Sequence, residues 1–431
     1  MRVFFFSLAA VLLASVLSAC GGGSGSSSPS STITAGSTTA GGAAIAISDP
    51  VAVNLPTGGA LQAMSDALVV GDFIVVRSRS DAFVTLNGRQ AYALTRLSVL
   101  DKQGKMLSST DYGFSLAAGY TGEWLMLASP DGFVMVQATS GTRLLHFDTQ
   151  ARLQGGATDL YPAVGPTSTT ELAAAENGGA VDGNGFWLAT TFSLLPVTDK
   201  TQYTLKLCKF DFNGRQLTPP FAISLSALHP RVAAAAGTVL AGWLEGGGAM
   251  LAMWPKGAGA PTIRSLGTGG AAPYPVALDA AGKMGVLWNG KATTTSSGGV
   301  MGVALDTSGA AVLPADRTDL TQESLSSHWN GNVRSADIDA HVIAGGLAIA
   351  GSVIGSFNAG EPVGDVLVLA DYGTGAGTLS AQQQKVLRFT LPGRAALGPT
   401  PILRQMLFGD HAVLLLGDDT RLQAFYTARK P

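Results

Sequence analysis

The sequence predicts an all-β fold, a β-propeller with seven blades of four short antiparallel strands, closed into a ring by an N-terminal strand. Short apolar runs alternate with Gly-bearing turns from residue 60 to the C-terminus. The chain has 56 Gly residues and 13% charged residues among 431 positions, which suits buried strands joined by tight turns. The most complete copy of the repeat lies between Pro273 and Pro314 and holds four short strands, as one propeller blade does.

This copy shows the alternation of strands and turns on which the prediction rests. Two turns have the sequence Asp-x-x-Gly, at 279–282 and 306–309, and Trp288 ends the second strand. Gly supplies the positive φ that such tight turns need. The strands expected in this blade are 276–278, 284–288, 300–305 and 310–313.

The other copies are less regular, with a spacing of about 55 residues against roughly 40–50 in typical propeller repeats. The last copy is short of strands, and an isolated strand at 44–55 can complete it and remove an exposed sheet edge. Six or eight blades also fit this spacing. The strands expected in the other blades are, in chain order, 67–76 and 92–100; 124–128, 133–137 and 143–147; 180–191 and 203–210; 231–244 and 249–254; 338–354, 365–370 and 386–389; and 411–416 and 422–427.

The repeat at 276–312 resembles those of large secreted bacterial propeller proteins, and 181–216 matches them in part. The shared pattern is an apolar run, Asp-x-x-Gly, a strand ending in Trp, a Gly/Ser loop and a second Asp-x-x-Gly. This resemblance implies the fold and carries no catalytic residues. A rival resemblance is the propeller lipoprotein of outer-membrane assembly, but its Thr-Gly-Trp pattern is missing from this sequence.

The N-terminus predicts a lipoprotein signal peptide over 1–19. Arg2 precedes an apolar stretch at 3–16, which is too short to span a membrane but has the length of a signal-peptide core. The sequence Leu17-Ser18-Ala19-Cys20 that follows resembles the lipobox of bacterial lipoproteins. The resemblance implies cleavage before Cys20 and a diacylglyceryl group on its thiol, whose acyl chains, such as palmitate, contribute about 0.8 kcal/mol per buried CH₂. The alternative is a secreted protein with a chance Cys near its cleavage site.

Residues 21–44 are Gly, Ser, Thr and Ala with one Pro, which predicts a flexible tether with a reach of roughly 25–30 Å. By resemblance to the sorting rule of Gram-negative lipoproteins, Gly21 in place of Asp implies the outer membrane, and either face of that membrane remains open. We therefore expect a lipidated Cys20 and tether over 20–44 and a propeller domain over 45–431.

Composition narrows the possible partners. The formal net charge is −2 and no Lys/Arg cluster is present, so no nucleic-acid partner is expected. The two cysteines, Cys20 and Cys208, cannot form a disulfide framework, and Cys208 lies in an apolar strand pattern that favours a small buried hydrophobe. The sequence has no Gly-x-Ser-x-Gly, phosphate-binding loop, His-Glu-x-x-His or Cys-x-x-Cys motif, and no cofactor is predicted. Residues 182–185 are interpreted as a turn, since a calcium loop needs further oxygen ligands.

The best candidate for chemistry is the row Asp337, Asp339 and His341, whose spacing puts the three side chains on one face of a strand. Two carboxylates and an imidazole can bind a divalent metal or support acid–base catalysis, and on an innermost strand they would face the central channel. The alternative is a polar loop leading into the next apolar strand. Trp329 is a candidate contact residue on a polar loop. Three isolated histidines are interpreted as structural: His146, His229 and His411.

Two functions follow from these features. The first is a binding or assembly scaffold, held to the outer membrane by its lipid, for a protein or surface-polymer partner such as a glycan. The second is a metal-assisted periplasmic hydrolase or lyase that uses the row at 337–341. The absence of a recognised catalytic motif favours the scaffold over an enzyme.

Overall fold

In the computed structural model the described part of the chain is built of β-strands. Within it no helix has the length and apolar character required to cross a membrane. The structure describes residues 34–36, 45–55, 64–79, 83–86, 89–92, 94–113, 124–138, 142–161, 173–193, 203–268, 273–278, 281–290, 299–305, 318–319, 335–343, 346–355, 364–373, 380–389, 402–409, 411–417 and 421–427.

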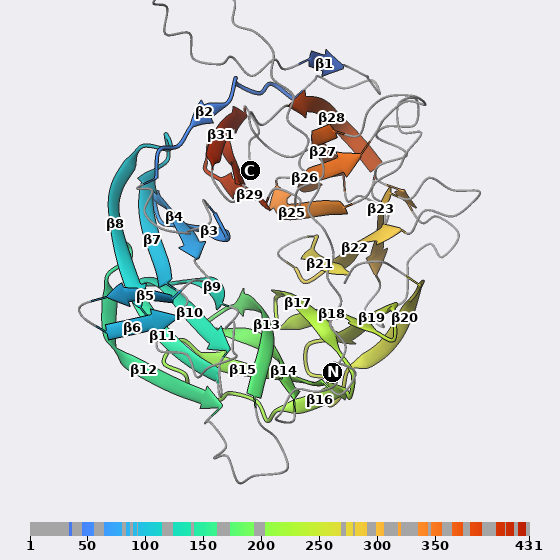
Figure 1. Cartoon of the computed structure of the whole chain (residues 1–431). Coiled ribbons are helices and arrows are strands. Elements are labelled where there is room, and N and C mark those ends of the chain that lie inside the picture. The colour runs from blue at the N-terminus through green and yellow to red at the C-terminus, as the bar shows by residue number, and fades with distance from the viewer. Residues whose placement is uncertain are drawn as a thin grey trace, which may run out of the picture.

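The described strands form seven antiparallel sheets of four or five strands and one two-stranded hairpin. Figure 1 shows the seven sheets arranged around a common axis, which makes the fold an all-β propeller with four-stranded blades. The strands of the first four sheets are β3 (Asp66–Val70), β4 (Phe73–Arg79), β7 (Leu94–Asp101) and β8 (Met106–Gly113); β9 (Trp124–Ser129), β10 (Gly132–Ala138), β11 (Thr142–Asp148) and β12 (Leu153–Tyr161); β13 (Ala173–Asp182), β14 (Gly185–Ser193), β15 (Thr204–Asp211) and β16 (Phe221–Ser224); and β17 (Leu228–Ala235), β18 (Thr238–Glu245), β19 (Gly248–Trp254) and β20 (Thr262–Thr268).

The remaining sheets include two short strands from the N-terminal region. The hairpin of β5 (Phe83–Leu86) and β6 (Arg89–Tyr92) is inserted between β4 and β7. The strands of the last three sheets are β21 (Tyr274–Ala277), β22 (Met284–Gly290), β23 (Gly299–Leu305) and β24 (Thr318–Asp319); β25 (Ser335–Ile343), β26 (Gly346–Gly355), β27 (Gly364–Gly373), β28 (Ser380–Phe389) and β1 (Thr34–Gly36); and β29 (Ile402–Leu407), β30 (Ala412–Gly417), β31 (Leu422–Thr427) and β2 (Val51–Ala52).

The first strand of each sheet belongs to an inner ring. Strands β3, β9, β13, β17, β21, β25 and β29 contact one another in this order, and β29 contacts β3. Each sheet begins at this ring and continues outward, so the seven inner strands run in the same direction and their N-terminal ends meet at one rim. Side chains far apart in the sequence are brought together there.

The N-terminal segment completes the sheet of the C-terminal strands. Val51 pairs with Ala424, and the backbone N–H of Ser48 donates to the carbonyl of Tyr426 at 2.8 Å. Ile45 is 4% exposed and packs between the last two sheets. The paired part, β2, is shorter than the strand expected at 44–55, and it adds a strand from the N-terminal region to the sheet of the C-terminal strands.

Part of the segment expected to be a flexible tether forms a strand. Residues 34–36 make up β1, which pairs with β28 from Thr34 opposite Arg388 to Gly36 opposite Val386. This differs from the tether predicted over 20–44, because a Gly/Ala/Thr segment can still add its backbone N–H and C=O groups to an open sheet edge. The rest of that segment, with Cys20, lies outside the described residues.

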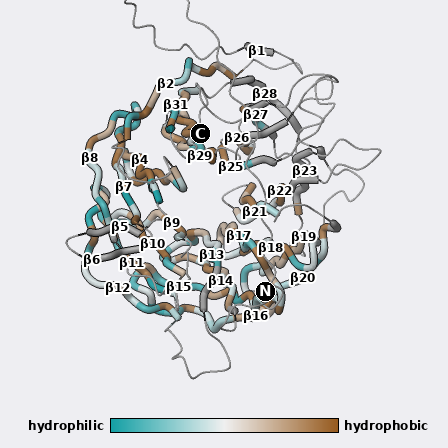
Figure 2. The backbone as a smooth tube through the Cα atoms, in the orientation of Figure 1, coloured by the Kyte–Doolittle hydropathy of each residue, from teal (hydrophilic) through white to brown (hydrophobic). Residues whose placement is uncertain are grey.

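Apolar side chains fill the spaces between neighbouring sheets. The rings of Phe133 and Phe147 stack on each other with their centroids 4.9 Å apart, and both pack against residues of the first sheet. Trp243 is fully buried between the third and fourth sheets. Figure 2 shows hydrophobic residues distributed along the strands around the ring. Cys208 is buried in the same way, and burial raises the pKa of its thiol, so the expectation of a buried small hydrophobe is confirmed.

The repeated Asp turns share one geometry. Oδ1 of Asp101 accepts the backbone N–H of Gln103 and of Lys105, each at 2.9 Å. The turns that start at Asp148 and Asp211 repeat the same pair of hydrogen bonds. One Asp side chain therefore satisfies two backbone donors in each turn, which gives the repeated Asp a physical reason.

Several strands predicted as single runs are in fact hairpins. The run at 180–191 contains the turn between β13 and β14, and the run at 231–244 contains the turn between β17 and β18. The run at 338–354 covers β25 and β26. These predictions were wrong because short turns such as that at Gly237 interrupt the apolar pattern too briefly to mark two strands. The fourth strand expected at 310–313 lies outside the described residues, and that sheet is completed by β24.

Candidate functional site

The predicted row lies on the inner strand β25. Ile338 and Ala340 pack into an apolar cluster with residues of β21, β22 and β26. Asp337 and Asp339 alternate with them and reach the neighbouring strand β29. His341 is half-buried next to Asp339, with 3.2 Å between Nε2 and Oδ2. The strand therefore separates an apolar side from a polar side, and the polar side contacts the next sheet.

The two carboxylates bind backbone donors of β29. The N–H of Leu403 donates to Oδ2 of Asp337 at 2.9 Å, and the N–H of Gln405 donates to Oδ2 of Asp339 at 2.6 Å. Alternate side chains of one strand and alternate N–H groups of another have the same two-residue spacing. Because β29 is the last strand of its sheet on this side, its N–H groups need acceptors from elsewhere. The row supplies them.

Arg404 extends these contacts to a third inner strand. Its Nη1 lies 3.0 Å from Oδ2 of Asp337 on β25, and its Nε lies 2.8 Å from Oδ1 of Asp66 on β3. Burial alone would lower the pKa of Arg404, but Asp337 and Asp66 outweigh it and raise the pKa further above its ordinary value. A charged guanidinium thus joins the sixth, seventh and first sheets.

Asp339 is the most constrained member of the row. Its side chain is 8% exposed and accepts hydrogen bonds from the Tyr274 hydroxyl at 3.0 Å and from the Gln405 N–H. Burial would raise the pKa of Asp339, yet the pKa is lowered overall because His341, Arg404 and the Gln405 N–H stabilise the carboxylate. The pKa of Tyr274 is raised, by burial first and by Asp339 second. No three His, Cys, Asp or Glu side chains of the described part are grouped to hold a metal ion.

A second polar cluster joins β13 to β17. Glu176 accepts a hydrogen bond from the backbone N–H of His229, and its Oε1 lies 3.1 Å from His229 Nδ1. The His229 side chain is 60% exposed, and its backbone has a φ of 53°. A positive φ is uncommon outside Gly and indicates a conformation held by its surroundings. His229 is thus paired with Glu176, as the structural histidine that its sequence context suggested would be, but its side chain is largely exposed.

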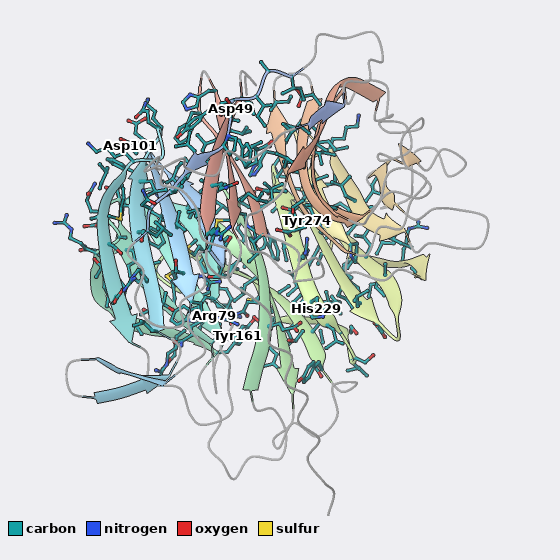
Figure 3. The ribbon with its side chains drawn as sticks, turned by 45° about the horizontal axis from the view of Figure 1, so that its top comes forward. Asp49, Arg79, Asp101, Tyr161, His229 and Tyr274 are labelled. Carbon is teal, nitrogen blue, oxygen red and sulfur yellow. The ribbon has the colours of Figure 1, made fainter. Side chains whose placement is uncertain are left out.

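Arg231 connects this cluster to the row. Its guanidinium lies 4.8 Å from the centroid of the Tyr274 ring, within range of a cation–π contact. Figure 3 labels His229 on β17 and Tyr274 on β21. Since Tyr274 also donates to Asp339, polar contacts link four consecutive inner strands, β13, β17, β21 and β25.

The remaining candidates do not join these clusters. Trp329 lies outside the described residues, as does Cys20. His411 stacks against Phe408 at 5.3 Å, and burial lowers the pKa of His146, in keeping with structural roles for both. Glu176 and His229 were missed because their meeting depends on contacts between sheets. The available signal was Pro230 inside an otherwise strand-like run, since Pro in a strand marks an edge or a bulge.

Comparison with known proteins finds likeness to solved structures at low sequence identity. No family model matches the chain, and no curated protein matches it. Among solved structures, the Dos1 propeller is 9% identical with a TM-score of 0.47, covering 90% of this chain and 96% of that one. The propeller domain of the Trilobed protease from Pyrococcus furiosus is 10% identical with a TM-score of 0.45, covering 86% and 94%. The polysaccharide lyase Uly1 is 9% identical with a TM-score of 0.43, covering 88% and 92%.

Proposed function

We propose that this protein is a lipid-anchored propeller of the outer membrane that acts as a binding or assembly scaffold for a protein or surface-polymer partner. In this proposal, acyl chains on Cys20 hold the chain to the membrane and the following residues lead to a seven-bladed ring. The lipobox-like sequence at 17–20 and the Gly/Ser/Thr-rich segment after it support the anchor. Either face of the membrane accommodates this arrangement.

One observation favours a scaffold function over an enzymatic one. The polar side chains that the sequence offered for catalysis are engaged in joining sheets, because Asp337 and Asp339 accept backbone N–H groups of β29. A carboxylate that already binds a backbone donor in a buried contact has less capacity to hold a metal or to exchange protons with a substrate. The same contacts stiffen the ring, and a stiff ring presents a fixed binding surface.

The metal-assisted hydrolase or lyase has weaker support. It requires Asp337, Asp339 and His341 to converge on one ion, with oxygen and nitrogen lone pairs directed to a common point. Both carboxylates point instead to β29, and the imidazole contacts one of them. Their alignment along a strand spreads the three groups, and a shared metal would have to break two inter-sheet hydrogen bonds.

A pull-down from intact, crosslinked cells tests the scaffold. The bait is the full-length chain, and the matched control is Cys20→Ala, which keeps the signal core and loses the acylated thiol. We expect a partner that is recovered with the anchored protein and lost with the control. Equal recovery with both forms contradicts the anchor, and recovery of no protein or polymer with either contradicts the scaffold.

A further inference from the structure

The N-terminal segment reaches the ring from its outer side. β1 pairs with β28 and β2 pairs with β31, so the segment adds an outermost strand to the sixth and to the seventh sheet. Figure 1 shows both short strands on the perimeter of the ring. Residues 21–33 separate Cys20 from β1, and a flexible chain of that length reaches roughly 20 Å. An acyl anchor on Cys20 therefore draws this side of the perimeter toward the membrane.

Exposed apolar side chains lie on the same side of the ring. Val51 on β2 is 49% exposed, and Met106 and Leu107 on β8 are 38% and 48% exposed. β2 is the outermost strand of the seventh sheet, and β8 is the outermost strand of the first. The first and seventh sheets are neighbours, because β29 contacts β3. Neighbouring apolar side chains that remain exposed indicate an interaction surface.

Strand pairing brings these side chains to one place. Met106 lies opposite Leu100 of β7, and Leu100 packs in one cluster with Val53, two residues after Val51. The register of β7 against β8 then shifts, which leaves Leu107 as the extra residue of a bulge. Bulges redirect side chains, in keeping with the exposure of Leu107. The three apolar side chains thus border the junction of the seventh and first sheets.

A positive charge accompanies the apolar side chains. A Cβ on Gly104, in the turn before β8, would lie 3.7 Å from the Cβ of Ala424, the residue paired with Val51. Lys105 follows this turn and is exposed. Lys102, in the same turn, lies 3.9 Å from Asp72. An ammonium group beside exposed apolar side chains suits a membrane surface, where it meets lipid phosphates while the apolar groups enter the acyl-chain boundary.

We propose that Val51, Lys105, Met106 and Leu107 form a membrane-contact patch that lies on a bilayer containing anionic lipids. The lipid surface is the occupant because the segment that carries the proposed anchor joins the ring on this side. The inference rests on the proposed lipid anchor and adds an orientation to it. The perimeter at the seventh and first sheets faces the membrane, and the fourth sheet, across the ring, faces away and is open to a partner.

A fluorescent dye on the lipidated full-length protein tests the patch. The vesicles contain phosphatidylethanolamine and phosphatidylglycerol, and in one set the acyl chains carry doxyl groups, which quench a dye at the membrane. Leu107→Cys supplies the attachment point, since Cys208 is buried and acylation blocks the Cys20 thiol.

Ile263→Cys is the matched control. Ile263 is 44% exposed on β20, the outermost strand of the fourth sheet, which is three sheets away from both the first and the seventh. Figure 1 shows β20 on the opposite side of the ring from β8. We expect doxyl lipids to quench about half of the emission at position 107 and less than about a tenth at position 263.

A charge reversal tests the role of Lys105. Lys105→Glu should lower the quenching at position 107 at least twofold, because a carboxylate is repelled by the anionic phosphates. Lys256→Glu changes an exposed Lys in the corresponding turn of the fourth sheet and should leave the quenching unchanged. Thermal unfolding of each variant checks that it is folded.

Equal quenching at positions 107 and 263, or none at 107, overturns the patch. A dye at 107 that is shielded from water but not quenched by doxyl lipids indicates a second copy of the chain as the occupant and also overturns it. Flotation of the same vesicles measures the anchor separately. Protein that floats without quenching at 107 keeps the anchor and refutes the patch, whereas protein that does not float contradicts the anchor itself.

Discussion

The carboxylate of Asp339 accepts a hydrogen bond from the backbone N–H of Gln405 at 2.6 Å, across the junction between two sheets. The residues are 66 positions apart and belong to the inner strands of different sheets. The contact gives the Gln405 N–H an acceptor at the edge of β29, where no further strand of its own sheet pairs with it. It assigns a structural role to a side chain that, by sequence pattern, was a candidate metal ligand.

Asp339→Ala should lower the free energy of unfolding by about 2–4 kcal/mol, because it leaves the Gln405 N–H and the Tyr274 hydroxyl without this acceptor at a cost of roughly 1–3 kcal/mol each. Chemical denaturation measures the change. The matched control is Asp131→Ala in an exposed turn, which should stay within about 0.5 kcal/mol of the wild type. Equal effects of the two substitutions would contradict the role given to Asp339.

The contribution of Asp339 should depend on pH. Its pKa is lowered in the folded state, so the stabilisation is fully present above the unfolded Asp pKa of about 3.9 and is lost as the pH falls from there toward the folded pKa. The stability difference between wild type and Asp339→Asn should therefore be larger at pH 7 than at pH 3. Denaturation at both pH values measures it, and a difference that grows at pH 3 would show that the charged form is not the stabilising one.

Ala236→Gly should stabilise the protein by about 0.5–1 kcal/mol, because Gly relieves a positive φ at an exposed turn position. Ala236 has a φ of 51°. Ala151 has a φ of 56° but is buried in the core between the first two sheets, so Ala151→Gly also removes a packed methyl group and should gain less. Thermal unfolding compares the two variants, and a larger gain at Ala151 would contradict this reasoning.

Ile45→Ala should destabilise the protein by about 2–4 kcal/mol, since Ile45 is buried between the last two sheets in the segment that closes the ring. Val51 belongs to the same segment but is 49% exposed. Val51→Ala is therefore the matched control, with an expected change of about 0.5 kcal/mol or less. Similar effects of both substitutions would mean that burial of the N-terminal segment contributes little to closing the ring.

The repeat could be predicted from the sequence because its turns and strands are marked by residues that lie close together in the chain. Each turn is defined within five positions. It begins with an Asp whose side chain binds the backbone N–H groups two and four residues later, and Gly, or Ala in one turn, stands three residues after the Asp. The strands beside these turns follow from their apolar runs. Where a turn is very short, as at Gly237, two strands merged into one prediction.

The contacts between sheets could not be predicted from the sequence, because they depend on which strands become neighbours in the fold. The alternation of Asp337 and Asp339 was visible, but their acceptor role required the N–H groups of β29. The same holds for Glu176 and His229, which meet only because bulges on two inner strands face each other. A bulge shifts the alternation of one strand by a single residue, but the sequence of that strand does not say which other strand it faces.

Asp337 and Asp339 join two sheets through the backbone N–H groups of β29, and we infer that this structural role is the main one of the row at 337–341. The most direct test is the free energy of unfolding of the wild type and of Asp339→Ala, each measured with excess chelator and with a divalent metal such as Zn²⁺. A ligand that binds only the folded state stabilises it by an amount that grows with its concentration. We predict that Asp339→Ala is destabilised equally in both conditions and that metal leaves the wild type unchanged. Stabilisation of the wild type by metal, absent in Asp339→Ala, would contradict a purely structural role for Asp339.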